Sequence, residues 1–537
     1  MASFAIRTED VTREAILRLY VETTKAKEAV ELLKSGTPVF LEGSRGTGKT
    51  FLLRVTEAQL LAEHRQSRVL PVYVSFLKSS LLQSGDPNQF TNWMMARLCS
   101  RMVRTLFQLG LLTEPMRLLS LLTGEEAPVD QRETRLERVA AEFEESYRNP
   151  GRAVDTGVIP SVQDFKGAVE EICRARGIDR VVLFFDKAAH VFRPDQQRQF
   201  FTLFRDLGSP HLSCKAAVYP EMVTYGSTFP AADDASIVSL SSNFQDREYL
   251  SAMREMVSRQ ADPALLANLE DSQQNFEALA FAACGNPRFL LMTVALAQHL
   301  DSAEAEKALR QFYRNDIWSQ HFGLADSYPV HRALMEWGRR FIEATVIPDL
   351  VGRNEASARE GRTGSTCNFW IHRDAPAGVS EALRLLGYKG IVTRLWAGGQ
   401  TTRSEVGTGY AVNLGCLVSA TANPVDALIS LSRRSLNLGR FVDYAASHPS
   451  FAPLLSMVRT EEVDLSAVLA SELAKPIDVL DLTECQKRGL RSVGLDTVCK
   501  ALQGSDVQLQ KIYYVGPKKS RQMLNTVVAS VHEYLSG

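Results

Sequence analysis

The 537-residue sequence lacks most of the features by which membrane, secreted and metal-binding proteins are identified. No apolar run approaches the roughly 18 residues that a membrane-spanning helix needs, and the first residues have neither the basic region nor the apolar core of a signal peptide. The eight cysteines include no C-x-x-C pair, and the nine histidines show no H-x-x-x-H spacing. We therefore expect no membrane span, no zinc site, and free thiols in a reducing cytoplasm.

The sequence also lacks an excess of charge of either sign, because 61 Lys and Arg residues stand against 62 Asp and Glu residues. A nearly neutral chain has no overall attraction for nucleic acid, so any such binding has to come from a local patch. Hydrophobic residues make up 45% and charged residues 23% of the chain, as in ordinary globular proteins. The length then predicts about two to four domains.

One stretch near the N-terminus carries a specific phosphate-binding pattern, G-x-x-x-x-G-K-[ST]. It follows an apolar run that predicts a buried strand, and a helical pattern follows it. Its glycines allow a tight turn in which backbone N–H groups point at phosphate oxygens; the lysine reaches the β- and γ-phosphates, and the threonine hydroxyl holds a magnesium ion. The predicted nucleotide-binding residues are Gly43, Ser44, Arg45, Gly46, Thr47, Gly48, Lys49, Thr50 and Phe51.

A second stretch, Arg180 to Asp186 (RVVLFFD), supplies the partner of this loop. Five consecutive apolar residues that end in an aspartate predict a buried parallel strand, which carries a carboxylate to the metal ion and its water shell. Thr50 and Asp186 are therefore the predicted ligands of Mg²⁺, and the predicted ligand of the loop is a nucleoside triphosphate.

The residue after this aspartate departs from the pattern of an active ATPase. ATPases of this kind place a glutamate there, which orients and deprotonates the attacking water, whereas this chain has Lys187. A lysine, with a reference pKa of about 10.4, is cationic at pH 7 and cannot act as that base. It is expected instead to pair with Asp186 or to reach the γ-phosphate, so that nucleotide binding is retained while hydrolysis is weakened or absent.

Three further segments carry candidate groups for the same site. Arg198 and Arg205 lie near the ends of an amphipathic helix predicted over 196–207; each is either an arginine finger that acts on a neighbouring subunit or a solvated surface residue. Tyr219 ends a predicted strand and is either a sensor of the γ-phosphate or part of the core. Pro287 begins an apolar helix, and Arg288 beside it either holds its guanidinium over the phosphates or lies on the helix surface.

Together these motifs resemble those of AAA+ ATPases of the origin-recognition-complex-like branch and of the related STAND signalling ATPases. The resemblance covers about residues 1–310 and is carried by GSRGTGKT (43–50), LFFDKAAH (183–190), AVYP (217–220) and GNPR (285–288). It implies an α/β fold with an αβα core of strand order 5-1-4-3-2, followed by a helical lid that donates Arg288 as the sensor 2 residue. It also implies partner subunits, because a neighbour's arginine usually completes an AAA+ site.

The chain beyond the lid has the pattern of a winged helix, which origin-recognition ATPases carry at this place. Two helices predicted within 330–386 are followed by a predicted hairpin from 390 to 414. Arg394 and Arg403 on this hairpin are candidate contacts to DNA phosphates. Winged helices also serve as protein-docking modules, so the pattern leaves both partners open.

Basic residues gather near the C-terminus: between Leu482 and Arg521, eight basic residues stand against three acidic ones, a net charge of +5. Turn signals around Gly494 and Gly516 predict helix-hairpin-helix units, in which turn N–H groups meet a phosphate. The segment resembles tandem hairpin units such as the C-terminal domain of the bacterial RNA polymerase alpha subunit, except that Tyr514 stands where many hairpins have their first glycine. The alternative is a small protein-interaction domain. Candidate DNA contacts are Gly516, Lys518, Lys519 and Arg521.

The predicted architecture is an AAA+ core (1–235, with a helical insertion at about 80–165), a helical lid (236–320), a winged-helix-like domain (325–420), a helical linker (421–478) and an all-α helix-hairpin-helix domain (479–537). We expect an ATP-binding switch that controls assembly and DNA binding in a bacterial antiviral-defence or mobile-element complex, as a homo-oligomer or with an effector protein. Two alternatives remain: a STAND-type signalling ATPase whose C-terminal modules bind protein, and a transposition-regulator ATPase that forms filaments on DNA.

Overall fold

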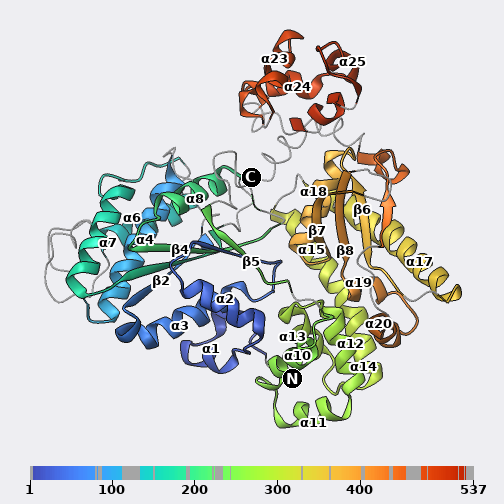
Figure 1. The fold of residues 1–537 in the computed structure, drawn as a ribbon, viewed down its shortest axis with the longest axis horizontal. Coiled ribbons are helices and arrows are strands. Elements are labelled where there is room, and N and C mark those ends of the chain that lie inside the picture. The colour runs from blue at the N-terminus through green and yellow to red at the C-terminus, as the bar shows by residue number, and fades with distance from the viewer. Residues whose placement is uncertain are drawn as a thin grey trace. The chain divides into compact units, whose positions relative to one another are not determined.

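The structure, a computed structural model of the chain, divides into two compact units, each described below by itself (Figure 1). Residues 5–241 and 254–260 form the first unit, and the second consists mainly of residues from 261 onward. The structure describes residues 4–78, 82, 88–111, 134–148, 151–188, 194–220, 223, 234–241, 244–327, 331–361, 364–400, 406–433, 440–454, 473–480, 482–517, 519–524 and 526–527.

The first unit is built on a five-stranded parallel sheet with the order β2-β3-β4-β1-β5. The strands are β1 (Val39–Glu42), β2 (Val69–Ser75), β3 (Arg180–Asp186), β4 (Leu212–Val218) and β5 (Ser236–Ser239). This order is the predicted 5-1-4-3-2, so the predicted α/β core is confirmed. Since β5 pairs with β1, the sheet reaches beyond the boundary predicted at residue 235.

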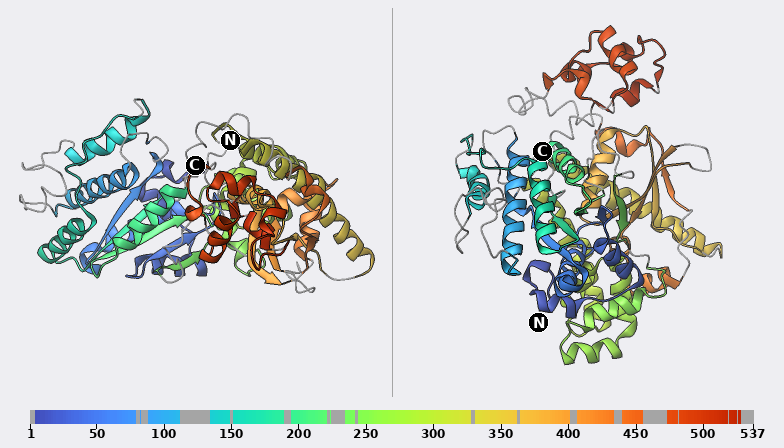
Figure 2. Two further views of the ribbon diagram at one scale, coloured as in Figure 1. Left: turned by 90° about the horizontal axis from the view of Figure 1, so that it is seen from above. Right: turned by 60° about the vertical axis from the view of Figure 1, so that its left-hand side comes forward.

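Helices cover both faces of this sheet (Figures 1 and 2). In β3, Val181, Leu183 and Phe185 belong to the core on one face, while Val182 and Phe184 belong to the core on the other. Burial on both faces is what a continuous apolar run in a parallel strand predicts. One face packs against α1 (Arg13–Leu19), α2 (Thr24–Lys34) and α3 (Lys49–Ser67), and the other against α4 (Gln89–Gln108), α6 (Arg135–Glu145), α7 (Val162–Arg176) and α8 (Pro194–Asp206).

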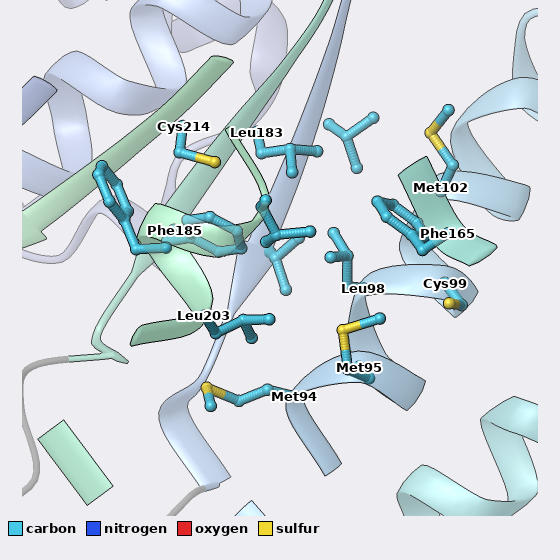
Figure 3. Packing of buried hydrophobic residues seen from close by; sticks show 14 of the residues in the cluster. Met94, Met95, Leu98, Cys99, Met102, Phe165, Leu183, Phe185, Leu203 and Cys214 are labelled. Carbon is cyan, nitrogen blue, oxygen red and sulfur yellow. The ribbon is translucent and has the colours of Figure 1, made fainter. Parts of the chain in front are cut away.

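The core on the α4 face is the larger of the two and is rich in sulfur and aromatic side chains (Figure 3). Met94, Met95 and Met102 of α4 pack there together with Phe165 of α7 and Leu203 of α8. Unbranched methionine side chains fill the irregular space between a twisted sheet and crossing helices. All eight cysteines of the chain are free.

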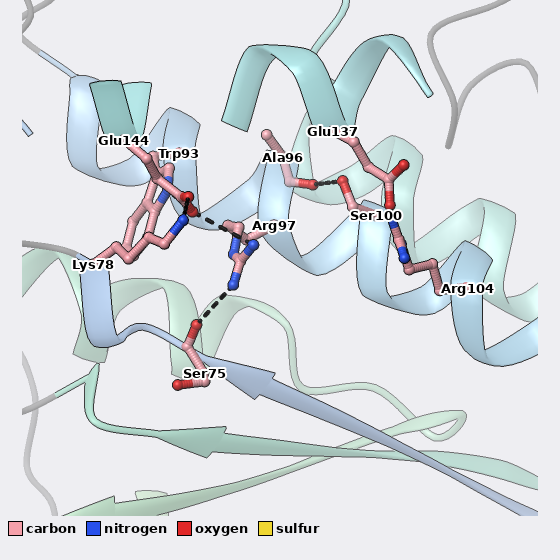
Figure 4. Close-up of polar contacts among 9 residues, drawn as sticks. All are labelled: Ser75, Lys78, Trp93, Ala96, Arg97, Ser100, Arg104, Glu137 and Glu144. Carbon is pink, nitrogen blue, oxygen red and sulfur yellow. Dashed lines mark hydrogen bonds and ion pairs between the residues drawn. The ribbon is translucent and has the colours of Figure 1, made fainter. Parts of the chain in front are cut away.

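A buried carboxylate ties α6 to α4 and to the end of β2 (Figure 4). Glu144 of α6 accepts hydrogen bonds from the Lys78 ammonium at 2.6 Å and from the Trp93 indole N–H at 3.3 Å, and Arg97 pairs with it at 3.4 Å. Arg97 also donates to the Ser75 carbonyl, the last residue of β2. A buried charge is tolerated when it is paired in this way, and the network holds the strand end that lies beside the functional site.

A buried lysine fixes the turn that leads into β1. Lys215 of β4 has no exposed surface, and its ammonium donates to the carbonyls of Ser35 at 2.9 Å, Leu32 at 3.4 Å and Thr37. These carbonyls lie at and just beyond the C-terminal end of α2, where a cation complements the helix dipole. Burial lowers the pKa of Lys215 to about 7.

The second unit begins with helices and continues into a mixed sheet. Its strands are β6 (Asn368–His372), β7 (Val392–Gln400), β8 (Val406–Val412) and β9 (Val442–Tyr444), in the order β7-β8-β6-β9. The helical elements after β5 are α10 (Tyr249–Ser258), α11 (Pro263–Asp271), α12 (Gln273–Ala283), α13 (Pro287–Leu296), α14 (Ser302–Arg310), η5 (Gln311–Asp316), α15 (Ile317–Ser327), α16 (Arg332–Phe341), η7 (Ile342–Val346), α17 (Ile347–Arg359), α18 (Ala377–Tyr388), α19 (Leu414–Val418) and α20 (Pro424–Arg433).

The predicted helix followed by a hairpin is present as α18 and the antiparallel pair β7-β8. The sequence did not indicate β6, which pairs antiparallel with β8, or β9, which runs parallel to β6. The region 421–478, which was predicted to be mostly helical, thus contributes an edge strand. Runs of three to five residues are too short for their periodicity to separate a strand from a buried helical turn.

The C-terminal segment forms a small all-α core of its own. Its elements are η10 (Ile477–Val479), α23 (Glu484–Ser492), α24 (Val498–Gln503) and α25 (Asp506–Leu509). Buried Leu490, Leu509 and Met523 belong to this core, as does Ile477, which precedes the predicted start of the domain at residue 479.

Across the described ranges, no helix combines the length and the apolar character that crossing a membrane requires.

The lowered pKa of Lys215 makes the burial of this side chain in the turn before β1 testable. Between pH 7 and the ordinary lysine pKa of 10.5, the unfolded chain binds more protons at this position than the folded chain does, so the free energy of unfolding should rise with pH. We expect the wild-type protein to gain about 2 kcal/mol relative to Lys215→Met between pH 7 and 9. Urea unfolding at both pH values measures this; a pH-independent difference would contradict it.

Candidate nucleotide-binding site

The phosphate-binding loop lies between β1 and α3, and its glycines are required by geometry. Gly46 and Gly48 have φ angles of 98° and 93°, which L-residues with a side chain rarely adopt. A Cβ atom on Gly43 would lie 2.4 Å from the Thr47 Oγ1 atom. That Thr47 hydroxyl donates to the Ser44 carbonyl at 3.0 Å and closes the turn. The loop therefore makes the tight turn that the sequence predicts.

The first turn of α3 presents an anion-binding end. No side chain caps the helix at Gly48, so first-turn N–H groups are left for a ligand. Lys49 is buried, and its ammonium donates to the carbonyls of Gly43 and of Ser44, the latter at 2.8 Å. The same ammonium lies 3.8 Å from the centroid of the Tyr219 ring. Tyr219 thus lies against the ammonium of Lys49, beyond the end of β4.

A buried carboxylate at the end of β3 accepts hydrogen bonds from two hydroxyl groups. Asp186 is 2% exposed and accepts from the Thr50 hydroxyl, at 3.0 and 3.2 Å to its two oxygens, and from the Tyr73 hydroxyl at 2.7 Å. Burial raises the pKa of Asp186, while the Tyr73 hydrogen bond, the Lys187 charge and the Thr50 hydrogen bond oppose that shift. Clustered oxygen donors around a buried carboxylate fit a small divalent cation such as Mg²⁺.

Tyr73 was not predicted as a site residue, although it lies in a predicted strand. Burial raises its pKa well above the ordinary value, so the phenol keeps its proton and acts as a hydrogen-bond donor to Asp186. The Arg54 guanidinium stacks 4.7 Å from the ring centroid of Tyr73 and pairs with Glu57 at 2.7 Å. The sequence indicates the contact between Tyr73 and Asp186 only in that β2 and β3 are both apolar strands. It is the pairing of these two strands that brings the two side chains together.

Lys187 follows β3 directly and pairs with a residue that the sequence did not indicate. Its backbone has a φ angle of 62°, in the left-handed region, and its ammonium forms an ion pair with the Glu9 carboxylate. Glu9 belongs to η1 (Thr8–Asp10), a short turn before α1. The predicted ion pair with Asp186 is therefore replaced by one with Glu9, and Lys187 acts on Asp186 through its charge.

The predicted arginines lie in different places. Arg205 is in the last turn of α8, is partly exposed and pairs with Asp206 at 3.2 Å; Arg198 lies earlier on the same helix. Pro287 and Arg288 begin α13 in the second unit, where the Asn286 side chain accepts from the Arg288 backbone N–H at 3.1 Å. The role of Arg205 as an arginine finger and that of Arg288 as sensor 2 remain predictions.

The predicted DNA contacts lie in the second unit. Arg394 is exposed on β7, and Gly516, Lys519 and Arg521 are exposed in the C-terminal domain. Arg403 and Lys518 lie outside the described residues. The remaining residues predicted for the nucleotide, Arg45 and Phe51, are both half-buried beside the loop.

The loop, the Thr50–Asp186 pair and the strand order β5-β1-β4-β3-β2 together define an AAA+ P-loop ATPase domain. Residues 3–93 match the family model described as ORC-CDC6-like, so this part of the chain is similar to that family. No curated protein matches the chain.

The solved structures that are similar to this chain include two proteins of Aeropyrum pernix and one of Thermotoga maritima. The Aeropyrum pernix ORC1 protein in complex with DNA is 14% identical, covers 76% of this chain and 92% of its own, and gives a TM-score of 0.34. The Aeropyrum pernix ORC2 protein, in ADPNP–ADP complexes, is 11% identical over 78% and 92%, with a TM-score of 0.33. RuvB of Thermotoga maritima is 12% identical over 73% and 96%, with a TM-score of 0.28.

The Tyr73–Asp186 hydrogen bond makes a testable contribution to metal binding. In Tyr73→Phe, loss of this bond should raise the pKa of Asp186 further, so the Mg²⁺-dependent gain in affinity for a non-hydrolysable ATP analogue should appear about one pH unit higher. Fluorescence titrations with and without Mg²⁺ from about pH 5 to 8 measure the midpoint. Tyr20→Phe, which removes another largely buried phenol, is the control. An unchanged midpoint in Tyr73→Phe would show that the bond does not tune the carboxylate.

Proposed function

We propose that this chain is an ATP-binding AAA+ switch that controls oligomeric assembly and DNA binding. The observation that supports it most is the hydrogen bond between Thr50 and the buried Asp186, beside a glycine loop whose carbonyls accept from the buried Lys49. Such a pair has no evident use in packing, because a buried carboxylate costs free energy unless a ligand or a partner compensates it.

Each residue of the site has a role in this proposal. The loop N–H groups and Lys49 bind the phosphates, and Lys49 then exchanges the carbonyls of Gly43 and Ser44 for phosphate oxygens. Thr50 and Asp186 hold Mg²⁺, which when bound neutralises the charge of the phosphates. Tyr73 and Arg54 position the carboxylate from the neighbouring strand and helix.

Hydrolysis is proposed to be slow because no general base follows Asp186. Lys187 is cationic and already paired with Glu9, so neither its charge nor its contact suits proton abstraction from water. The nucleotide would then act by its presence, as a ligand that holds one conformation, rather than by repeated turnover.

DNA binding is proposed for the second unit, through Arg394 and the basic C-terminal domain. The support is charge: the segment 482–521 carries a net +5 in a chain of net −1. Contacts of this kind are to the phosphate backbone, with little sequence preference and strong salt dependence. Assembly as a homo-oligomer or with an effector protein, with Arg205 acting on a neighbour, and a place in a defence or mobile-element complex complete the proposal.

DNA binding is tested first by fluorescence anisotropy with and without ATP and Mg²⁺, for the full chain and for a chain that ends at residue 472. This end precedes Ile477, so it removes the C-terminal core as a whole. We expect ATP-dependent binding that weakens about tenfold or more on truncation at low salt.

The alternatives predict other outcomes of the same experiment. If neither chain binds DNA at low salt, the DNA part of the proposal is wrong, and a STAND-type switch that recognises protein becomes the better account. Binding that is cooperative and depends on DNA length would instead favour a filament-forming transposition regulator.

The Lys187 position gives a separate test of turnover. A glutamate there would face Glu9, so the informative variant is the double substitution Glu9→Gln with Lys187→Glu, which supplies a base without a like-charge neighbour. We expect its ATP hydrolysis rate to exceed that of the wild type by about 100-fold, while Glu9→Gln alone stays slow. A wild-type protein that already hydrolyses ATP at about 1 s⁻¹ or faster would contradict the assignment.

A further inference from the structure

The second turn of the C-terminal domain exposes two adjacent aromatic side chains. Tyr513 is 85% and Tyr514 77% exposed, more than any other large hydrophobic side chain of the described residues. Their rings contact each other edge to face, with centroids 4.4 Å apart. Neither ring is used by the small hydrophobic core beneath, whose nearest member is Ile512. Large apolar groups left outside a core in this way commonly mark a binding surface.

The backbone of the second turn is strained at a residue with a side chain, whereas the first turn has glycine at that place. In the first turn the residue with positive φ is Gly494, at 80°; in the second it is Tyr514, at 62°. A residue with a Cβ atom is disfavoured in this left-handed region, where glycine is not. Glycine would therefore serve the turn better, and a tyrosine at such a position is more readily explained by what its ring does than by folding.

The free positive charge of the domain lies at this same turn. Three of the four basic residues around the first turn form ion pairs within the domain: Lys487 with Glu484, Arg491 with Asp478, and Lys500 with Asp496. The fourth, Arg488, is exposed and donates to the Glu484 carbonyl of its own helix at 3.4 Å. Lys511, Lys519 and Arg521 are exposed and form no ion pair within the part of the chain that the structure describes. The sequence has no acidic residue from Val507 to Arg521. An anionic partner is thus favoured more strongly at the second turn than at the first.

We propose that the second turn binds single-stranded DNA, with unstacked bases on Tyr513 and Tyr514 and the adjoining phosphates on Lys511, Lys519 and Arg521. Exposed aromatic rings next to unpaired cations are the combination that single strands require, because every base has a face that can stack. Bases within a duplex are already stacked on each other and offer only their edges in the grooves. This inference rests on the proposed DNA binding and adds the form of DNA preferred.

The experiment uses the full chain with two labelled probes, a 20-nucleotide oligo(dT) strand and a 20-base-pair duplex. The variants are Tyr513→Ala and Tyr514→Gly; the second removes the ring and gives the turn the residue that Gly494 already provides, so the domain should be at least as stable. Val507→Ala, which trims another exposed apolar side chain of the domain, is the matched control. We expect each tyrosine variant to bind oligo(dT) about tenfold more weakly, and the control and duplex affinities to stay within about twofold.

The outcomes separate this inference from the function on which it rests. If the wild type binds neither probe, the proposed DNA binding fails and this inference fails with it. If the wild type binds DNA but the tyrosine variants bind oligo(dT) as well as it does, DNA binding stands and base stacking is wrong. Equal losses on both probes, with unchanged thermal unfolding, would show that the tyrosines support a contact to the backbone rather than to unpaired bases.

Discussion

The carboxylate of Asp186 is the constraint on which the rest of the first unit depends. It ends a strand that is buried on both faces, so water cannot solvate it, and it is stabilised by hydroxyl groups from α3 and from β2. Thr50 and Tyr73 reach it only if the sheet has its observed order and α3 starts at Lys49. The Glu144 network and the buried Lys215 hold the ends of β2 and the entry to β1, and so serve the same geometry.

The sequence predicted the parts of this site that are local in the chain. The glycine loop has a fixed spacing, and β3 is a continuous apolar run, so both are found without a structure. Tyr73 and Glu9 were missed because they approach the end of β3 from 113 and 178 residues away in the sequence. Contacts over such distances follow from strand pairing and chain path, which no local pattern encodes. The short strands β6 and β9 were missed for a different reason, since their few residues carry no readable period.

In the C-terminal domain, the preference for glycine at a positive φ angle is met in the first turn and not in the second. Both turns need a residue with positive φ, and glycine meets that need at 494 while tyrosine meets it at 514. The ion pairs follow the same division, because they compensate most of the basic residues of the first turn and leave the second cationic. The two turns therefore differ in conformational strain, charge and apolar exposure at once.

The ion pair between Lys187 and Glu9 couples the beginning of the chain to the metal position. An unpaired ammonium beside Asp186 would repel an incoming divalent cation, and the Glu9 carboxylate offsets that repulsion when η1 is in place. If Asp186 holds Mg²⁺ as proposed, cation binding and docking of η1 are linked equilibria, and each favours the other by the same free energy. The segment η1 (Thr8–Asp10) then acts as an effector of the site and is covalently attached to it.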